Sequence, residues 1–371
     1  MMRQDIFKIL FIITIKDSFG ERTHALSFVK QLLKQINFSP IFFVGDNNLK
    51  SFFEKQKIKS FYFDKYEELT NSIINENPNL IICCEYYHLT EKFRDFLSSL
   101  KIPIATIDGT SMGDEINSTI KTNILPSNII KLRPCPINDP LTNTENIKYW
   151  NLFPELQKNI LDKEFIKRYY KIPDDSKIIF MAISMWEIST SKFLGLNIDN
   201  FYNNLFSILF LVFQNIKHQI TFFIISPFKQ DIIKNKNLTV HFLNVLEYEL
   251  YQKLLLSSDL VLSTNIIQTS MSQAFIEKIK TLALINTKNK KLFEYEFNIF
   301  PLKIKFPEDR EYYQLINKAE IFDIKEIFEK VNFLLNSDEE DKKINDYIFK
   351  IKSLKNVCEI TQEIIKKNKG F

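Results

Sequence analysis

Glycine is the residue that this sequence most lacks, with only 6 in 371 positions. Loops that cradle nucleotide phosphates are usually rich in glycine, and no G-x-G-x-x-G pattern follows a predicted strand, which argues against a dinucleotide-dependent dehydrogenase. The 4 cysteines show no C-x-x-C spacing. This argues against a disulfide framework and a cysteine-based metal centre, and it fits a reducing cytoplasm. Because no Asp-x-Asp pattern lies near a strand end, we also predict no metal ion.

A strong charge of one sign and long apolar runs are missing as well. The 49 basic and 45 acidic residues leave a net charge of +4, which is too small to indicate nucleic acid or an anionic membrane as the main partner. The apolar runs at residues 6–15 and 205–213 are too short for a signal peptide or a transmembrane segment. We therefore predict a soluble, cytoplasmic protein, and the weak positive charge remains compatible with binding of a phosphorylated small molecule.

The first half of the chain alternates short apolar runs with longer amphipathic segments. This rhythm predicts a parallel sheet with helices on both faces. The prolines that cluster between residues 120 and 150 predict an irregular stretch there, and a helix follows over residues 154–170. The predicted strands cover residues 8–14, 39–45, 59–63, 79–84 and 103–107, and the predicted helices cover residues 21–35, 49–57, 66–76 and 90–100.

A second alternation of the same kind begins after the turn-rich residues 171–177. We therefore predict an N-terminal Rossmann-like domain over residues 1–170 and a C-terminal Rossmann-like domain over residues 171–338. One long helix over residues 339–371 would follow, and packing against the first domain is one option for it. The predicted strands cover residues 177–183, 219–225, 238–243, 260–263 and 281–285, and the helices residues 200–215, 247–256, 269–280 and 321–335.

Three phrases of the sequence resemble the GT-B glycosyltransferase superfamily: NPNLIICCEYYH, LKIPIATIDGT and NVLEYELYQKLLLSSDLVLSTN. The resemblance implies an α/β protein with two doubly wound, Rossmann-like domains that face each other across a cleft. It departs from the family in its glycines. Gly20 stands alone in the turn after the first strand, and residues 267–270 carry no glycine where many members have one.

A polar stretch from Ser263 to Ser270 separates an apolar strand from a predicted helix. A helix that begins near Thr269 leaves backbone N–H groups without partners and carries a partial positive charge at that end. Asn265, Thr269 and Ser270 are therefore candidates for holding the diphosphate of a nucleotide. The alternative is local, with Thr269 capping the helix and Asn265 shaping a turn.

The resemblance points to two further donor contacts in the second domain. Ser184 and Trp186 follow a strand at its carboxyl end, where ligands collect in open α/β sheets; the alternative is a surface loop. Backbone groups of Val245 and Leu246 could pair with the base, and Glu249 could accept the ribose hydroxyls. The alternative for Glu249 is a first-turn acid that complements the helix dipole.

The acceptor side should come from the first domain. Glu85 and Asp108 each follow a buried strand directly, so we expect both to project into one cleft. His24 lies in the opening turns of the first helix. We predict that Asp108 or His24 is the general base, with Glu85 as a third candidate. A structural role for His24 and a simple turn at Asp108 are the alternatives.

Together these features predict a glycosyltransferase that moves a sugar from a nucleotide-diphosphate donor to an unidentified acceptor. The prediction includes no metal ion and no cofactor besides the donor itself. Two rival predictions remain open. One is a nucleotide-sugar epimerase or hydrolase of the same fold, and the other is a non-catalytic partner protein that has lost the donor chemistry.

Overall fold

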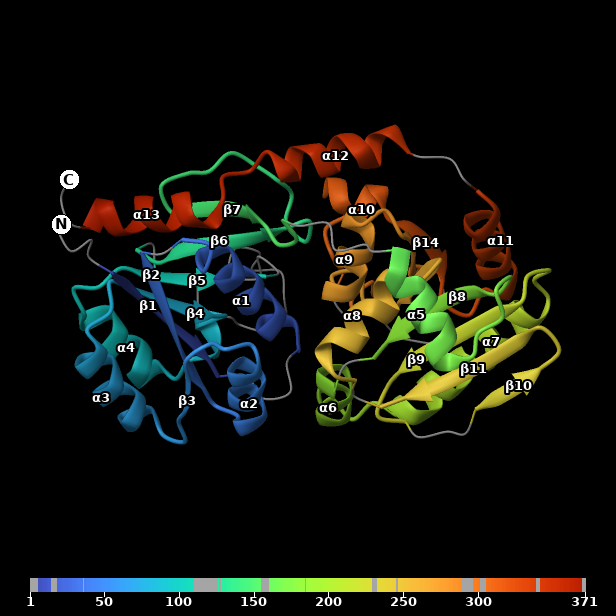
Figure 1. The fold of residues 1–371 in the computed structure, drawn as a ribbon, viewed down its shortest axis with the longest axis horizontal. Coiled ribbons are helices and arrows are strands. Elements are labelled where there is room, and N and C mark those ends of the chain that lie inside the picture. Colours follow the sequence, from blue (N-terminus) through green and yellow to red (C-terminus); the bar gives the residue numbers. More distant parts are fainter. Residues whose placement is uncertain are drawn as a thin grey trace. The chain divides into compact units, whose positions relative to one another are not determined.

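The chain forms two compact units, which are described separately here. Unit 1 is Met1–Pro154 with Tyr347–Phe371, and unit 2 is Glu155–Asp346. Figure 1 shows the fold of the computed structural model. It describes residues 6–14, 19–35, 37–109, 126, 128–154, 160–183, 185–228, 232–244, 246–288, 296–300, 305–337 and 341–368. The helices of the described part of the chain include none long and apolar enough to cross a membrane.

Unit 1 contains a seven-stranded sheet in the order β3-β2-β1-β4-β5-β6-β7, and every pair of neighbours is parallel. The chain fills one side of β1 first and then returns to place β4 on the other side, which makes the β1/β4 boundary a topological switch point. The strands are β1 (Phe7–Ile13), β2 (Phe38–Val44), β3 (Ser60–Tyr62), β4 (Leu80–Cys84), β5 (Ile104–Ile107), β6 (Ile130–Cys135) and β7 (Ile147–Asn151).

Apolar side chains of the unit 1 strands point alternately to two helical layers. Leu10 and Ile12 pack with α3 (Tyr66–Glu76) and α4 (Glu91–Ser99). Phe11 faces the other way, where its ring lies 5.9 Å from that of Phe28 on α1 (Phe19–Leu32). Phe42 on the same face stacks on Phe53 of α2 (Asn47–Lys55) at 4.1 Å. The sheet is therefore buried on both faces, as its continuous apolar strands predict.

Residues 128–150 are not irregular throughout, as their prolines suggested, because they contain β6 and most of β7. Residues 120–125 and 127 lie outside the described residues. Pro134 is tolerated inside β6 because β6 pairs with β5 only as far as Leu132. Beyond that point Pro134 lies opposite Trp150 of β7 alone, so its missing N–H group removes no bond to β5.

Unit 2 contains a second seven-stranded sheet in the order β10-β11-β9-β8-β12-β13-β14. All its strand pairs are parallel except β10 with β11. Its topological switch point lies between β8 and β12. The strands are β8 (Lys177–Ala182), β9 (Ile220–Ile225), β10 (Ile233–Asn235), β11 (Leu238–Leu243), β12 (Leu260–Ser263), β13 (Lys280–Ile285) and β14 (Asn317–Glu320).

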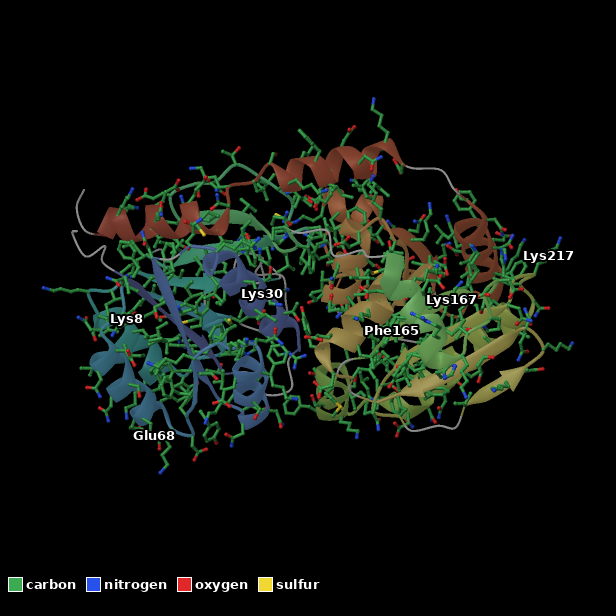
Figure 2. All side chains as sticks on the ribbon, in the orientation of Figure 1. Lys8, Lys30, Glu68, Phe165, Lys167 and Lys217 are labelled. Atoms are coloured by element: carbon green, nitrogen blue, oxygen red, sulfur yellow. The ribbon has the colours of Figure 1, made fainter. Side chains whose placement is uncertain are left out.

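Helices cover both faces of this sheet as well. One face packs with α7 (Ile198–Gln214) and α11 (Ile324–Asn336), and the other with α5 (Ile160–Tyr170), α8 (Tyr248–Leu256) and α9 (Thr269–Ile276). On α5, Ile166 is fully buried against this second core. Helix α5 therefore lies in unit 2, whereas the sequence analysis assigned residues 154–170 to the first domain. Exposed charged side chains such as Lys8, Glu68 and Lys217 lie on the outside of the units (Figure 2).

The expected long final helix is two helices, α12 (Lys342–Lys352) and α13 (Val357–Asn368). The break occurs because the Asn356 side chain accepts a hydrogen bond from the Glu359 N–H group at 2.9 Å, which starts a new helix. Helix α13 packs against α1 in unit 1, where Cys358 Sγ donates to the Gln31 carbonyl at 3.3 Å. Lys148 and Glu363 form an ion pair at 3.4 Å on the same side of unit 1.

Candidate functional site

Three candidate residues of the first domain meet at Gly109 in unit 1. A methyl group built on Gly109 would lie 3.1 Å from His24 Cε1 and 3.6 Å from Glu85 Oε1. Asp108 is the preceding residue. His24 comes from α1, Glu85 follows β4 and Asp108 follows β5. The side chains of His24 and Glu85 therefore lie together beside the carboxyl ends of β4 and β5.

His24 is held in the neutral form by its surroundings. His24 is 6% exposed. Burial lowers the pKa of its imidazole to about 4, although the nearby charge of Glu85 acts to raise it. Nε2 is buried and has no hydrogen-bond partner among the described residues. A neutral imidazole with a free nitrogen can accept a proton or a hydroxyl hydrogen, which is the minimum that a general base requires.

Glu21 is a site residue that the sequence analysis missed. It lies three positions before His24 on α1, so both side chains share one face of the helix. Its Oε2 atom is buried without a partner among the described residues, although other parts of the residue reach solvent. Burial and the neighbouring charge of Glu85 raise the pKa of Glu21 to about 8. The three-residue spacing between Glu21 and His24 in the sequence GERTH is the signal that could have indicated this residue.

Glu85 adopts a backbone conformation that is uncommon for a residue with a side chain. Its φ of 59° and ψ of 74° lie in the left-handed region, which costs a non-glycine residue about 1–3 kcal/mol and is enriched at functional sites. Glu85 is 8% exposed, and its Oε2 lies 3.2 Å from Nε2 of His88 in the short helix η1 (Tyr86–His88). The strained position turns the carboxylate toward Gly109.

Asp108 is fully buried and is engaged within the protein. Its Oδ2 accepts a hydrogen bond from Arg133 Nε at 3.4 Å, and Arg133 itself is 6% exposed. To serve as the base, Asp108 would have to act from within this ion pair. Sequence reasoning did not find Arg133, because residues 120–150 were expected to be irregular.

The loop before α9 in unit 2 is ordered by its own polar side chains. Asn265 Oδ1 accepts from the Ile267 N–H group at 3.1 Å, so Asn265 shapes the turn, as the local alternative suggested. Ser263 Oγ donates to Gln268 Oε1 at 2.6 Å, and Gln268 Nε2 donates to the Ala182 carbonyl at 3.0 Å. These bonds join the carboxyl ends of β8 and β12 at the switch point.

The amino end of α9 lacks a side-chain cap. Its N-cap residue, Gln268, makes no side-chain capping bond, so the first backbone N–H groups of the helix have no acceptor from that side chain. Ser270 is 5% exposed, and its Oγ is buried without a partner among the described residues. Thr269 is half-buried beside it. Because Gln268 is the N-cap and Thr269 is the first residue of the helix, Thr269 is not the residue that caps it.

The remaining donor candidates lie at several places in unit 2. The Leu246 side chain packs on the core next to α8. Glu249 is exposed in the first turn of α8. Trp186 lies in α6 (Met185–Phe193), a helix where a loop was expected. Ser184, Val245 and the side chain of Trp186 fall outside the described residues.

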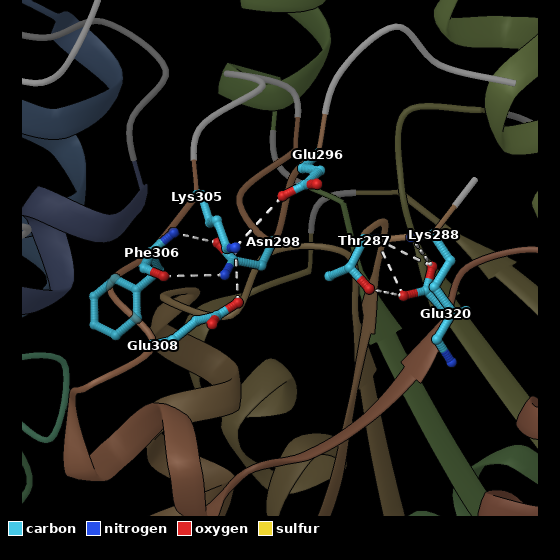
Figure 3. A network of polar contacts seen from close by, with 8 residues as sticks. All are labelled: Thr287, Lys288, Glu296, Asn298, Lys305, Phe306, Glu308 and Glu320. Carbon is cyan, nitrogen blue, oxygen red and sulfur yellow. Dashed lines mark hydrogen bonds and ion pairs between the residues drawn. The ribbon is translucent and has the colours of Figure 1, made fainter. Parts of the chain in front are cut away.

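Figure 3 shows two groups of polar contacts in unit 2, one around Glu320 and one around Asn298. Glu320, 4% exposed, accepts from the N–H groups of Thr287 at 3.1 Å and Lys288 at 3.2 Å. Asn298 Nδ2 donates to the Phe306 carbonyl at 3.2 Å, and the Asn298 carbonyl accepts from the Ile266 N–H group at 3.0 Å. The Asn298 backbone is thereby bonded to the loop before α9. Within the described ranges, no three His, Cys, Asp or Glu side chains form a group suited to a metal ion.

Solved structures similar to this chain cover nearly its whole length. A glycosyltransferase from Rickettsia africae is 12% identical over 98% of both chains, with a TM-score of 0.57. The UDP-GlcNAc 2-epimerase from Methanocaldococcus jannaschii, solved with UDP-GlcNAc and UDP, is 13% identical over 97% of this chain and 100% of its own, with a TM-score of 0.59. MurG from Acinetobacter baumannii is 12% identical over 98% and 100%, with a TM-score of 0.55.

At these identities the likeness concerns the fold, and it confirms the predicted GT-B fold with two doubly wound, Rossmann-like sheets. No curated protein matches the sequence. A sequence model described as a family of unknown function, DUF6365, matches residues 30–295, and because this is most of the chain, the protein belongs to that family.

Proposed function

We propose that this protein is a glycosyltransferase that uses a nucleotide-diphosphate sugar. The observation that carries the proposal is the amino end of α9, which its N-cap side chain leaves uncapped at the switch point of a doubly wound sheet. The Ser270 hydroxyl there is buried and has no partner among the described residues. Backbone N–H groups and the helix dipole at such an end favour an anion. A departing nucleoside diphosphate has the required charge. Unit 2 would therefore hold the donor.

Unit 1 would supply the base. In the reaction, the acceptor hydroxyl gives its proton to Nε2 of His24 while its oxygen forms a bond to the anomeric carbon of the sugar. The bond between that carbon and the diphosphate oxygen breaks, and the nucleoside diphosphate leaves with the electron pair. Glu85 would stabilise the imidazolium that forms, because its carboxylate lies at the same edge of Gly109 as the ring. The buried ion pair of Asp108 and Arg133 would hold the backbone beside the site in place.

A second candidate is a nucleotide-sugar epimerase or hydrolase, and the pair of Glu21 and Glu85 favours it. Burial and the charge of Glu85 raise the pKa of Glu21 to about 8, so Glu21 holds its proton near neutral pH. A carboxyl group that keeps its proton can act as an acid, beside a second carboxyl group, on a single substrate. This reaction needs no acceptor.

The first experiment is a thermal-shift screen with nucleoside diphosphates, including UDP and TDP. A ligand at about 100 times its dissociation constant stabilises the folded state by about 2.7 kcal/mol. Ser270→Val should remove the shift, whereas Ser258→Val should keep it. Ser258 is a matched control because it is 6% exposed, lies in unit 2 and its hydroxyl donates to the Leu254 carbonyl of its own helix turn. A panel in which no diphosphate stabilises the protein contradicts the proposal and favours a non-catalytic partner protein.

Product analysis then separates the two reactions. A transferase leaves the nucleotide sugar largely intact until an acceptor is added, whereas an epimerase or hydrolase converts it alone. We also propose that the enzyme is cytoplasmic and needs no metal ion. A metal ion is not needed because the helix end rather than a cation would neutralise the diphosphate. Activity should therefore survive EDTA, and activity that is lost with EDTA and restored by a divalent cation would contradict this part.

A further inference from the structure

One buried side chain connects the ends of two strands beside the unit 1 site. Asn138 is 1% exposed, and its Nδ2 donates to the carbonyls of Gly109 and Pro134, both at 3.1 Å. A third acceptor, the Asp108 carbonyl, lies at 3.4 Å. The loop after β6 therefore holds the backbone that follows β5. Gly109 is the residue against which His24 and Glu85 lie.

The same loop is held from its other side by α12. Tyr347 is fully buried, and its hydroxyl donates to the Pro136 carbonyl at 3.1 Å, with Asp139 Oδ1 at 3.2 Å. Tyr347 is also the residue at which the chain re-enters unit 1 after unit 2. A continuous set of contacts thus runs from Tyr347 through the loop to Asn138 and Gly109.

The point at which the chain leaves unit 1 is attached to the same region. The Leu152 N–H group donates to the Cys135 carbonyl at 3.1 Å, directly before the loop. The Leu152 carbonyl accepts from Ser27 Oγ, and the Asn151 carbonyl accepts from Gln31 Nε2 at 3.1 Å. Ser27 and Gln31 follow His24 on α1. Both crossings of the chain between the units are therefore bonded to the elements that carry the site.

We propose that Asn138 and Tyr347 are positioning residues, which fix Gly109 against the His24 imidazole and thereby set the geometry of the base. This inference rests on the proposed function for its catalytic consequence, but the positioning itself can be measured without turnover. Neither side chain touches a reacting group.

The close approach at Gly109 makes this positioning sensitive to small movements. A distance of 3.1 Å from the position of a methyl group to His24 Cε1 is tighter than ordinary van der Waals contact. There is therefore no room for a side chain between Gly109 and that edge of the ring, and we expect the Gly109 backbone to keep water from it. If the loop relaxes, water gains access, and the pKa of His24 should rise toward its ordinary value. Substitutions at Tyr347 and Asn138 that introduce no charge leave Glu21 and Glu85, the acidic groups near the ring, in place.

The experiment uses the full chain with labelled histidine and compares Tyr347→Phe, Asn138→Ala and Thr361→Val. The chain has only 4 histidines, so the imidazole ε1 signals can be assigned one by one with His→Gln variants. Thr361→Val is a matched control, because Thr361 is fully buried in α13 and its hydroxyl donates only to the Val357 carbonyl.

In Tyr347→Phe and Asn138→Ala, we expect the His24 signal to move and its pKa to rise. The signals of His218 and His241, both in unit 2, should stay unchanged, as should all four signals in Thr361→Val. An unchanged His24 titration in a folded Tyr347→Phe protein would falsify the inference. Because Tyr347→Phe removes only one hydroxyl, it decides the question even if Asn138→Ala does not fold.

Turnover gives a second readout that tests the catalytic consequence. If a nucleotide sugar is a substrate, both variants should lower kcat by about tenfold or more while its KM stays within about twofold, because the donor is held by unit 2. An equal loss in Thr361→Val would indicate a general structural effect and contradict the positioning role. If no nucleoside diphosphate binds to the wild-type protein, the proposed function fails, and the His24 signals still decide whether the two residues position the imidazole.

Discussion

Replacing Glu21 by glutamine should make the protein more stable in alkali. Burial and the charge of Glu85 raise the pKa of Glu21 from 4.5 to about 8. A group whose pKa is higher in the folded state binds its proton more tightly there. Its contribution to stability is therefore complete below the unfolded pKa and is lost as the pH rises through the folded pKa.

The size of the effect follows from the difference between the ordinary pKa of Glu21 and its pKa in the folded protein. This difference of about 3.5 pKa units corresponds to about 5 kcal/mol. This is an upper limit, because Glu21 is partly exposed and water can screen its charge, so we expect about 2–5 kcal/mol. Glu21→Gln cannot ionise. The stability gained by the substitution should therefore be small near pH 4.5 and should grow until about pH 8, where it levels off.

The assay is urea unfolding followed by the fluorescence of Trp150, which is fully buried in unit 1. A Trp186→Phe background removes the other tryptophan, so that the signal reports unit 1 alone. Glu68→Gln, on an exposed position of α3, is the control and should show no such trend. If the difference between Glu21→Gln and its parent stays flat from about pH 5 to pH 9, Glu21 is not a buried proton-holding group and the reasoning is refuted.

Three further predictions concern the same site. Burial lowers the pKa of His24 to about 4, so stability should fall by up to about 3 kcal/mol as the pH drops from about 6.5 to 4, and His24→Gln should remove that fall in urea unfolding. Gly109→Ala should destabilise unit 1 by about 1–3 kcal/mol, because the added methyl group overpacks against the His24 ring. It should reduce turnover far more than UDP binding. A variant as active as the wild type would show that the spacing between Gly109 and His24 is unimportant. Arg133→Met should cost about 3–5 kcal/mol because the buried Asp108 carboxylate loses its Arg133 partner, and Asp108→Asn added to it should recover part of this loss in thermal unfolding.

Much of the fold could be predicted because its signals are local. Continuous apolar runs such as residues 79–84 are typical of buried parallel strands, and β4 occupies nearly that range. The strands β6 and β7 were missed because proline is normally a strong sign against a strand. At Pro134 the deciding fact is how far the neighbouring strand extends, and that is a property of the folded sheet.

The candidate site could be predicted only in part for the same reason. Strand ends pointed to Glu85 and Asp108, and the structure brings both to Gly109 with His24. The Arg133 partner of Asp108 is 25 residues away in sequence, and no local pattern connects them. The protonation of Glu21 depends on burial and on Glu85, which are likewise invisible in a single sequence. The roles of Thr269, Ser270 and Glu249 as donor contacts stay predictions.

The discontinuous make-up of unit 1 has a consequence for the order of biosynthesis. Val357, Ile360 and Ile364 of α13 are buried in the core of a unit whose first strand is near residue 7. These residues leave the ribosome after all of Glu155–Asp346 has been made. Unit 2 can thus fold while translation continues, whereas the α1 surface that awaits α13 stays uncovered until the end, so the part of the protein that is synthesised first is the last to be completed.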